Sequence, residues 1–207
     1  TVHSGVAMAM AKVAKDNNTL LIVPNAGADA ITGPLCAPNI FRSSFSNWQP
    51  GFAMGKVAAD RKIRTAVTLT WKYAAGDESV RGFKEGFEAL GGKVVGEVAF
   101  RAQDVDLRPQ LSKIKGATPD IIFSPNYYTD VSLSAKQARE LGIKCIMMGG
   151  DGWPSDNLIP LAGDALEGSY CVNHLDFEDP AVKPFKDAYT AKYKIPHLLT
   201  FGASQDV

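Results

Sequence analysis

The chain has 207 residues, of which 45% are apolar, and its 22 basic side chains balance its 22 acidic ones. Because nucleic-acid-binding proteins normally carry a basic excess or a basic stripe, this balance argues against nucleic acid as a partner. The sequence has no apolar run of about 18 residues, so it predicts no membrane-spanning segment.

The first 60 residues show an incomplete alternation of helix and strand. Apolar residues recur at helical spacing over 5–15, and residues 20–24 and 41–44 have the composition of short strands. A further helix is predicted over 49–61, and its apolar side could cover the sheet formed by the residues that follow.

From residue 64 onward, short apolar strands alternate with amphipathic helices. This alternation is typical of a mostly parallel sheet with helices on both faces. Right-handed crossovers would bring every strand-to-helix turn to one edge of the sheet, where open α/β folds bind ligands. The strands are predicted at 65–71, 93–100, 120–124, 143–148 and 168–172, and the helices at 77–90, 107–114, 131–141 and 157–162.

Two helix starts and a division into lobes follow from the same pattern. Asp77 is expected to cap the helix after the first of these strands, and Asp179-Pro180 is expected to start a helix near the end of the chain. Residues 45–173 are predicted to form one complete lobe. Residues 1–44 and 174–207 are predicted to be two pieces of another, partial lobe.

The most informative stretch is Gly149-Gly150-Asp151-Gly152-Trp153, which directly follows an apolar strand. A strand that ends in two glycines brings one carboxylate and one indole to the carboxyl edge of the sheet. Asp151 either makes a local turn or pairs with a ligand cation, and the nearby indole of Trp153 favours the ligand interpretation. Ser4 either caps the first helix or binds an anion together with the exposed amides.

Enzyme signatures are missing from this sequence. The patterns GxxxxGK[ST], GxGxxG and GxSxG do not occur, and His3, His174 and His197 lack metal-ligand spacing. The three histidines are expected at the surface or at a hinge. The sequence therefore predicts a protein that is not an enzyme and that needs neither a cofactor nor a metal.

Seven short motifs occur in a fixed order along the chain. They are HSGV at 3–6, VPNAGA at 23–28, FRSS at 41–44, YAAG at 73–76, YY at 127–128, GGDGW at 149–153 and AGDALEG at 162–168. Together they resemble the type I periplasmic binding proteins of the leucine/isoleucine/valine-binding kind. The resemblance implies an α/β fold with two flavodoxin-like parallel-sheet lobes joined by a hinge. It also implies a periplasmic or extracytoplasmic location and delivery of a branched-chain or aromatic amino acid to the membrane subunits of an ABC importer.

The resemblance also implies a set of ligand-binding residues. Ser4 and the backbone amides near Gly5 and Val6 would bind the ligand carboxylate, and Asp151 would pair with the α-ammonium group. The other implied contacts are Ala26, Gly27, Ala28, Tyr73, Tyr128 and Trp153.

Two departures from the family leave alternatives open. Ala75 stands where a branched-chain binder often has a larger residue, so a larger ligand or an aromatic or other small carboxylate is an alternative to an amino acid. The opening strands of the first lobe are absent from the given sequence, so that lobe is expected to be incomplete. A truncated or engineered fragment could take the missing strands from another copy and form a homodimer that binds no ligand.

Overall fold

The structure is a computed structural model that describes residues 1–155, 157–174, 176 and 179–194. Its strands are β1 (Leu21–Val23), β2 (Ile40–Arg42), β3 (Thr65–Trp71), β4 (Lys93–Phe100), β5 (Ile121–Ser124), β6 (Ile146–Gly149) and β7 (Tyr170–Cys171). Its α-helices are α1 (Ser4–Asp16), α2 (Trp48–Asp60), α3 (Ala74–Glu88), α4 (Arg108–Ala117), α5 (Tyr128–Glu140), α6 (Leu158–Ala162) and α7 (Lys183–Tyr193), with short 3-10 turns at Asp29–Ile31 and Gly163–Leu166.

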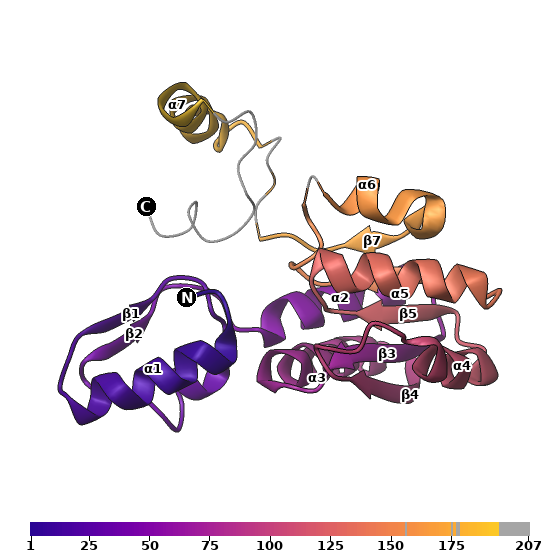
Figure 1. The fold of residues 1–207 in the computed structure, drawn as a ribbon, viewed down its shortest axis with the longest axis horizontal. Coiled ribbons are helices and arrows are strands. Elements are labelled where there is room, and N and C mark those ends of the chain that lie inside the picture. The colour runs from indigo at the N-terminus through magenta and orange to yellow at the C-terminus, as the bar shows by residue number, and fades with distance from the viewer. Residues whose placement is uncertain (156, 175, 177–178, 195–207) are drawn as a thin grey trace.

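Five parallel strands form the larger sheet, in the order β4-β3-β5-β6-β7 (Figure 1). Numbered along the chain from β3, this order is 2-1-3-4-5, which is the flavodoxin-like doubly wound arrangement. The carboxyl ends of β3, β5 and β6 therefore lie side by side at one edge of the sheet. The predicted alternation of buried strands and covering helices is confirmed over this part of the chain.

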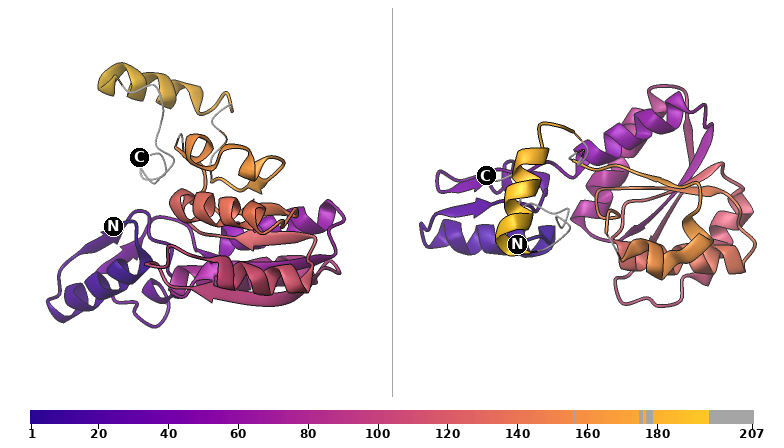
Figure 2. Two further views of the ribbon diagram at one scale, coloured as in Figure 1. Left: turned by 45° about the vertical axis from the view of Figure 1, so that its right-hand side comes forward. Right: turned by 90° about the horizontal axis from the view of Figure 1, so that it is seen from above.

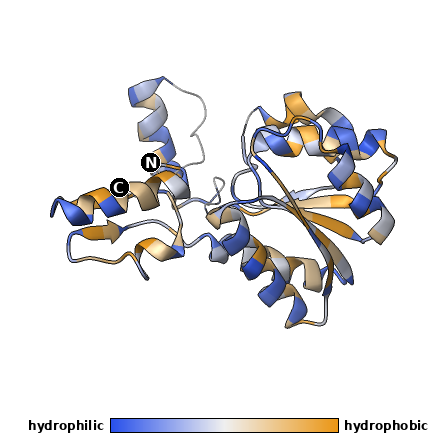
Figure 3. Ribbon diagram, turned by 60° about the horizontal axis from the view of Figure 1, so that its bottom comes forward, coloured by the Kyte–Doolittle hydropathy of each residue, from blue (hydrophilic) through white to orange (hydrophobic). Residues whose placement is uncertain are grey.

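The two faces of this sheet bury separate apolar layers. Helices α4, α5 and α6 cover one face, where Leu69, Ile122 and Met147 are fully buried. Helices α2 and α3 cover the opposite face, where Phe83 and Phe123 stack with ring centroids 4.1 Å apart. Hydrophobic strands between helices with hydrophilic outer sides are visible in Figure 3.

Helices α2 and α3 pack closely because glycines line their contact. Gly51 and Gly55 of α2 face the backbone of α3, and Gly82 and Gly86 of α3 face the backbone of α2. A Cβ atom at any of these four positions would lie 2.1–2.4 Å from a carbonyl oxygen of the other helix. Side chains are therefore excluded from this contact, and the backbones approach each other directly.

The first residues form a smaller unit beside the large sheet (Figure 2). Strands β1 and β2 pair in parallel, and α1 packs its alanines against one side of them. The outward residues of this unit remain exposed, including Val13 at 62% and Ile22 at 57%. A parallel sheet normally has both faces covered, so this unit presents an apolar surface that is unusual for its fold class.

Three predicted helix caps, at Ser4, Asp77 and Asp179, differ from the structure. His3 rather than Ser4 caps α1, because its Nδ1 accepts hydrogen bonds from the amides of Gly5 and Val6 at 3.1 and 3.4 Å. Helix α3 begins at Ala74, so Asp77 lies in its first turn instead of at its cap.

Helix α7 begins at Lys183, because the Asp179 carboxylate accepts from the amide of Ala181 and forms a turn ahead of the helix.

Across the described part of the chain, no helix is long and apolar enough to cross a membrane. Over the same residues, His, Cys, Asp and Glu side chains do not gather in groups of three or more that could hold a metal ion.

Candidate functional site

A small cavity lies where the two sheet units meet. Its walls come from the start of α1, the loop after β1, the segment before α2, the start of α3 and the loops after β5 and β6. The cavity has a volume of about 30 Å³, which is enough for one water molecule and far below the size of a typical ligand pocket. The lining residues are Val2, Ser4, Asn25, Gly27, Phe45, Asn47, Tyr73, Ala75, Ser79, Pro125, Tyr127, Asp151 and Gly152.

Asp151 already has a partner within the protein. Its Oδ2 atom lies 3.0 Å from Nε2 of His174, and the two side chains are only 19% and 17% exposed. The imidazole also stacks on the ring of Phe45, with centroids 3.9 Å apart. His174 is therefore held on one side by the carboxylate of the large sheet and on another by the segment that leads into α2.

Asn47 links the two sheet units through four hydrogen bonds. Its Nδ2 atom donates to the hydroxyl of Ser4 at 3.1 Å and to Oε2 of Glu78 at 2.7 Å. Its backbone amide donates to the carbonyl of Gly27, and its own carbonyl accepts from the hydroxyl of Ser79. Burial raises the pKa of Glu78, while the bond from Asn47 opposes that rise by favouring the carboxylate.

Hydrogen-bond donors are available around the cavity. Asn25 is 6% exposed, and its Nδ2 atom has no hydrogen-bond partner among the described residues. The Ser4 hydroxyl accepts from Asn47, which leaves its own proton to be donated. An anion bound here would satisfy an otherwise unpaired buried amide, and such amides are costly to leave unpaired.

Tyr73 and Tyr127 line one wall of the site and belong to a larger cluster of aromatic rings. Tyr73 stacks on His3 at 5.1 Å and lies 5.3 Å from Trp71, which in turn meets the edge of Tyr127 at 5.2 Å. Burial raises the pKa of Tyr73, with further increases from Tyr127 and the nearby charge of Asp151. Burial likewise raises the pKa of Tyr127. Both phenols therefore stay protonated at neutral pH.

Four of the ten predicted site residues line the same cavity. Ser4 and Gly27 come from the smaller unit, and Tyr73 and Asp151 come from the larger one. The rule that strand-to-helix turns share one edge predicted the position of Asp151 and Tyr73. The resemblance supplied Ser4 and Gly27 on the opposite side.

The structure places Trp153 and Tyr128 away from the cavity. Trp153 is 2% exposed, packs over Gly149 and donates its indole N–H to the carbonyl of Ser124 at 2.8 Å. Tyr128 is the first residue of α5 and packs against the apolar layer under that helix. Tyr127, one residue earlier and in extended conformation, takes the lining position instead.

The remaining predicted contacts are already used by the protein. The amides of Gly5 and Val6 bond the imidazole of His3. Ala26 and Ala28 are buried at 1% and 0%, with the amide of Ala26 bonded to the carbonyl of Thr1 and the carbonyl of Ala28 bonded to Arg42. The anion-binding role predicted for the start of α1 is thus reduced to the Ser4 hydroxyl.

Sequence reasoning missed Asn25, Asn47 and His174. Asn25 lies inside the VPNAGA motif, so its place after β1 was a usable signal. Asn47 and His174 lie in segments without regular pattern, and His174 was expected only at the surface or a hinge. His197 lies outside the described residues.

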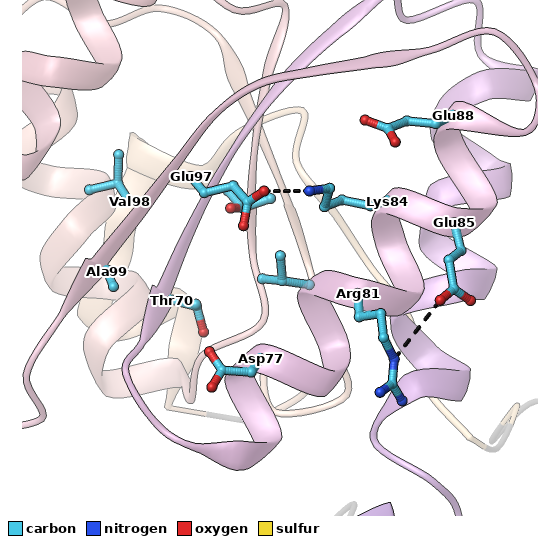
Figure 4. Close-up of a pocket in the computed structure, with 11 residues that line it drawn as sticks. Thr70, Asp77, Arg81, Lys84, Glu85, Glu88, Glu97, Val98 and Ala99 are labelled. Atoms are coloured by element: carbon cyan, nitrogen blue, oxygen red, sulfur yellow. Dashed lines mark hydrogen bonds and ion pairs between the residues drawn. The ribbon is translucent and has the colours of Figure 1, made fainter.

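A larger cavity of about 390 Å³ lies elsewhere, between the edge strand β4 and helix α3 (Figure 4). The charged side chains at its rim pair with one another, as Lys84 does with Glu97 and Arg81 with Glu85. The pairs are about half exposed and contribute little to stability. None of the predicted site residues lines this cavity.

The cavity lies at the carboxyl ends of parallel strands, which is where open α/β folds bind ligands. Comparison with known proteins identifies the family of the chain. The family model described as "Periplasmic binding protein" matches residues 1–204. A leucine-, isoleucine-, valine-, threonine- and alanine-binding protein of Pseudomonas aeruginosa is 31% identical over 184 residues, which are 88% of this chain and 49% of that protein.

Solved structures of solute-binding proteins are also similar to this chain. An ABC-transporter solute-binding protein from R. palustris in complex with benzoate is 37% identical, with a TM-score of 0.84, over 99% of this chain and 56% of that one. A leucine-binding protein from Thermotoga maritima is 28% identical, with a TM-score of 0.81, over 99% and 58% of the two chains. The chain belongs to the periplasmic binding protein family, which consists of binding proteins and not of enzymes. It spans about half the length of the relatives it matches.

Proposed function

We propose that this chain contributes the solute-binding cleft of an extracytoplasmic receptor that serves an ABC importer. The solute is a small carboxylate-bearing molecule held between two lobes. The observation that supports this proposal is the shared cavity of Ser4 and Asp151, two residues that lie 147 positions apart on different sheet units. The relatives that match the chain are solute-binding proteins, and they support the same conclusion.

Binding requires the two sheet units to move relative to each other. A cavity of about 30 Å³ cannot hold an amino acid or a benzoate, so the cleft opens before a solute enters. Closure over the solute then replaces contacts between the units by contacts through the ligand. Asn47, which bonds both units, lies at the centre of this movement.

Two classes of solute fit the relatives. Some matched proteins are named for branched-chain amino acids, and others are solved with benzoates. The rings of Tyr73 and Tyr127 line the cavity beside the small side chain of Ala75, and they favour a flat aromatic solute. A branched aliphatic side chain would make less use of this wall.

Calorimetry on the full chain tests the proposal. The solutes are leucine, valine, phenylalanine, benzoate and 4-hydroxybenzoate, each titrated up to millimolar concentration. Ser4→Ala is expected to weaken binding about ten- to hundred-fold, because a hydrogen bond to a charged group is worth about 1.5–3 kcal/mol. Ser112→Ala is the matched control, since the Ser112 hydroxyl bonds its own helix α4 at the surface. Failure of every solute to bind would refute the proposal.

A second candidate function rests on the exposed apolar surface of the smaller unit. A groove of about 750 Å³ runs along α1 and β1 and is lined largely by apolar side chains such as Val6, Met10 and Leu20. An assembly module that pairs two copies through this surface would bury it and would need no solute. A solution mass of twice the monomer, together with no solute binding, would favour this alternative.

A further inference from the structure

We propose that His174 determines the specificity of the cleft by taking the place of a ligand ammonium group at Asp151. The cleft then selects carboxylic acids that lack an α-amino group. This inference rests on the proposed function, because it concerns the solute class accepted by the same site.

The hydrogen bond between His174 and Asp151 satisfies the carboxylate from within the protein. An ionised carboxylate only accepts hydrogen bonds, so Nε2 of His174 is the donor whether the imidazole is neutral or charged. The 3.0 Å separation and the low exposure of both side chains indicate a formed and shielded contact. An incoming ammonium group would have to share or break it.

Other contacts hold His174 in this position. Its ring stacks on Phe45 with an interplanar angle of 27°, and its backbone amide donates to Oδ1 of Asn173 at 2.8 Å. The imidazole is therefore placed by two independent contacts, from the side chains of Asp151 and Phe45, while the Asn173 side chain bonds the backbone of the same residue. Displacing it would cost the stacking as well as the hydrogen bond.

The remaining cavity wall suits an anion better than an ammonium group. An α-ammonium group has three N–H donors and needs several acceptors. Among the described lining residues, the carbonyl of Gly27 already accepts from the amide of Asn47 and from Arg42. The unpaired amide of Asn25 and the hydroxyl of Ser4 are donors instead. A carboxylate matches these two donors, whereas the two acceptors best placed for an ammonium group, Asp151 and the Gly27 carbonyl, are already bonded within the protein.

Matched pairs of solutes that differ only in the α-amino group test the inference. We would titrate phenylalanine against 3-phenylpropanoate, and leucine against 4-methylpentanoate, into the full chain by calorimetry, with benzoate as a further acid. The expected result is that an acid without the amino group binds at least ten-fold more tightly than either amino acid.

Two substitutions separate the hydrogen bond from the shape of the ring. His174→Phe keeps a ring against Phe45 but removes the donor, and it should lower the preference for the deaminated acid at least ten-fold. His174→Gln supplies an N–H donor at a similar distance and should retain the preference. Circular dichroism and thermal melts would establish that both variants fold.

The possible outcomes are distinguishable. If the wild-type chain binds amino acids as tightly as their deaminated partners, or if His174→Phe folds and leaves the preference unchanged, the inference is wrong while the proposed function stands. If no solute of either kind binds, the proposed function and the inference fail together.

Discussion

The contact between α2 and α3 supports a prediction in which one methyl group has opposite effects at two positions. Gly55→Ala would place a Cβ atom 2.3 Å from the carbonyl oxygen of Phe83 and 2.8 Å from the amide nitrogen of Phe87. Because these are backbone atoms of a packed helix, no side-chain rotation can relieve the overlap. The helices would have to separate by about 1 Å to restore normal van der Waals contact.

The magnitude follows from two opposing effects. Overpacking of a rigid contact costs typically 1–3 kcal/mol, and we expect the upper end of that range here, about 3 kcal/mol. Alanine in place of glycine inside a helix raises the free energy of unfolding by about 1 kcal/mol, because alanine has the higher helix propensity. Gly55→Ala should therefore lower the free energy of unfolding by about 2 kcal/mol, which corresponds to a fall in Tm of about 4–8 °C for a chain of this size.

Gly116→Ala is the matched control. Gly116 lies in α4 and is exposed, and a Cβ atom there would meet no atom within 4 Å. The same methyl group should raise the free energy of unfolding there by up to about 1 kcal/mol. Urea denaturation followed by circular dichroism measures both variants. If Gly55→Ala stabilises the chain as Gly116→Ala does, the assignment of a close backbone contact between α2 and α3 is wrong.

Two further predictions concern the large sheet. Trp153→Phe should lower the free energy of unfolding by about 1–3 kcal/mol, because the buried carbonyl of Ser124 loses its indole donor. Urea denaturation measures the change. Hydrogen bonds from the backbone amides of Thr65 and Arg64 lower the pKa of Asp120 in the folded chain. The Asp120 carboxylate therefore stabilises the fold above about pH 4, and this stabilisation is lost as the pH falls through the lowered pKa. Asp120→Asn should therefore flatten the acid side of the stability curve measured by thermal melts.

Each of these predictions has a result that contradicts it. Trp48→Phe removes an indole bond to Glu85 at the exposed surface and should cost less than 1 kcal/mol, as surface contacts generally do. Equal losses in Trp153→Phe and Trp48→Phe would mean that burial of the indole bond has no special effect. Parallel acid curves for wild type and Asp120→Asn would show that the two backbone bonds do not hold the carboxylate ionised.

The sequence predicted β3 and β4 well because both are rich in β-branched and apolar residues and are followed by amphipathic helices. Both predicted ranges 65–71 and 93–100 coincide with β3 and β4. Helix starts were less accurate, since His3 bonds the amides expected for Ser4, and Asp179 bonds Ala181 in a turn ahead of the helix that it was expected to cap. Capping propensity says which residue types can accept a hydrogen bond from the first amides of a helix. It does not say which of several nearby side chains makes that bond.

The candidate site was predicted only in part, for a similar reason. The position of Asp151 follows from the order of the strands. The direction of the Trp153 side chain depends on Gly149, because a side chain at that position would overlap the indole. The contact between Asp151 and His174 joins residues 23 positions apart through an irregular segment. No periodicity encodes such a contact, so the sequence alone could not reveal it.

The four hydrogen bonds of Asn47, two from its side chain and two from its backbone, join the smaller unit to the large sheet. Ser4 and Gly27 anchor Asn47 on one side, and Glu78 and Ser79 anchor it on the other. If the two units rotate about this point, as the proposed function requires, at least one of these four hydrogen bonds must be strained or exchanged. Glu78 bonds Asn47 without lining the cavity, so under the proposed closure a substitution there would change the free-energy difference between the open and closed forms, and with it the affinity, without touching a solute atom.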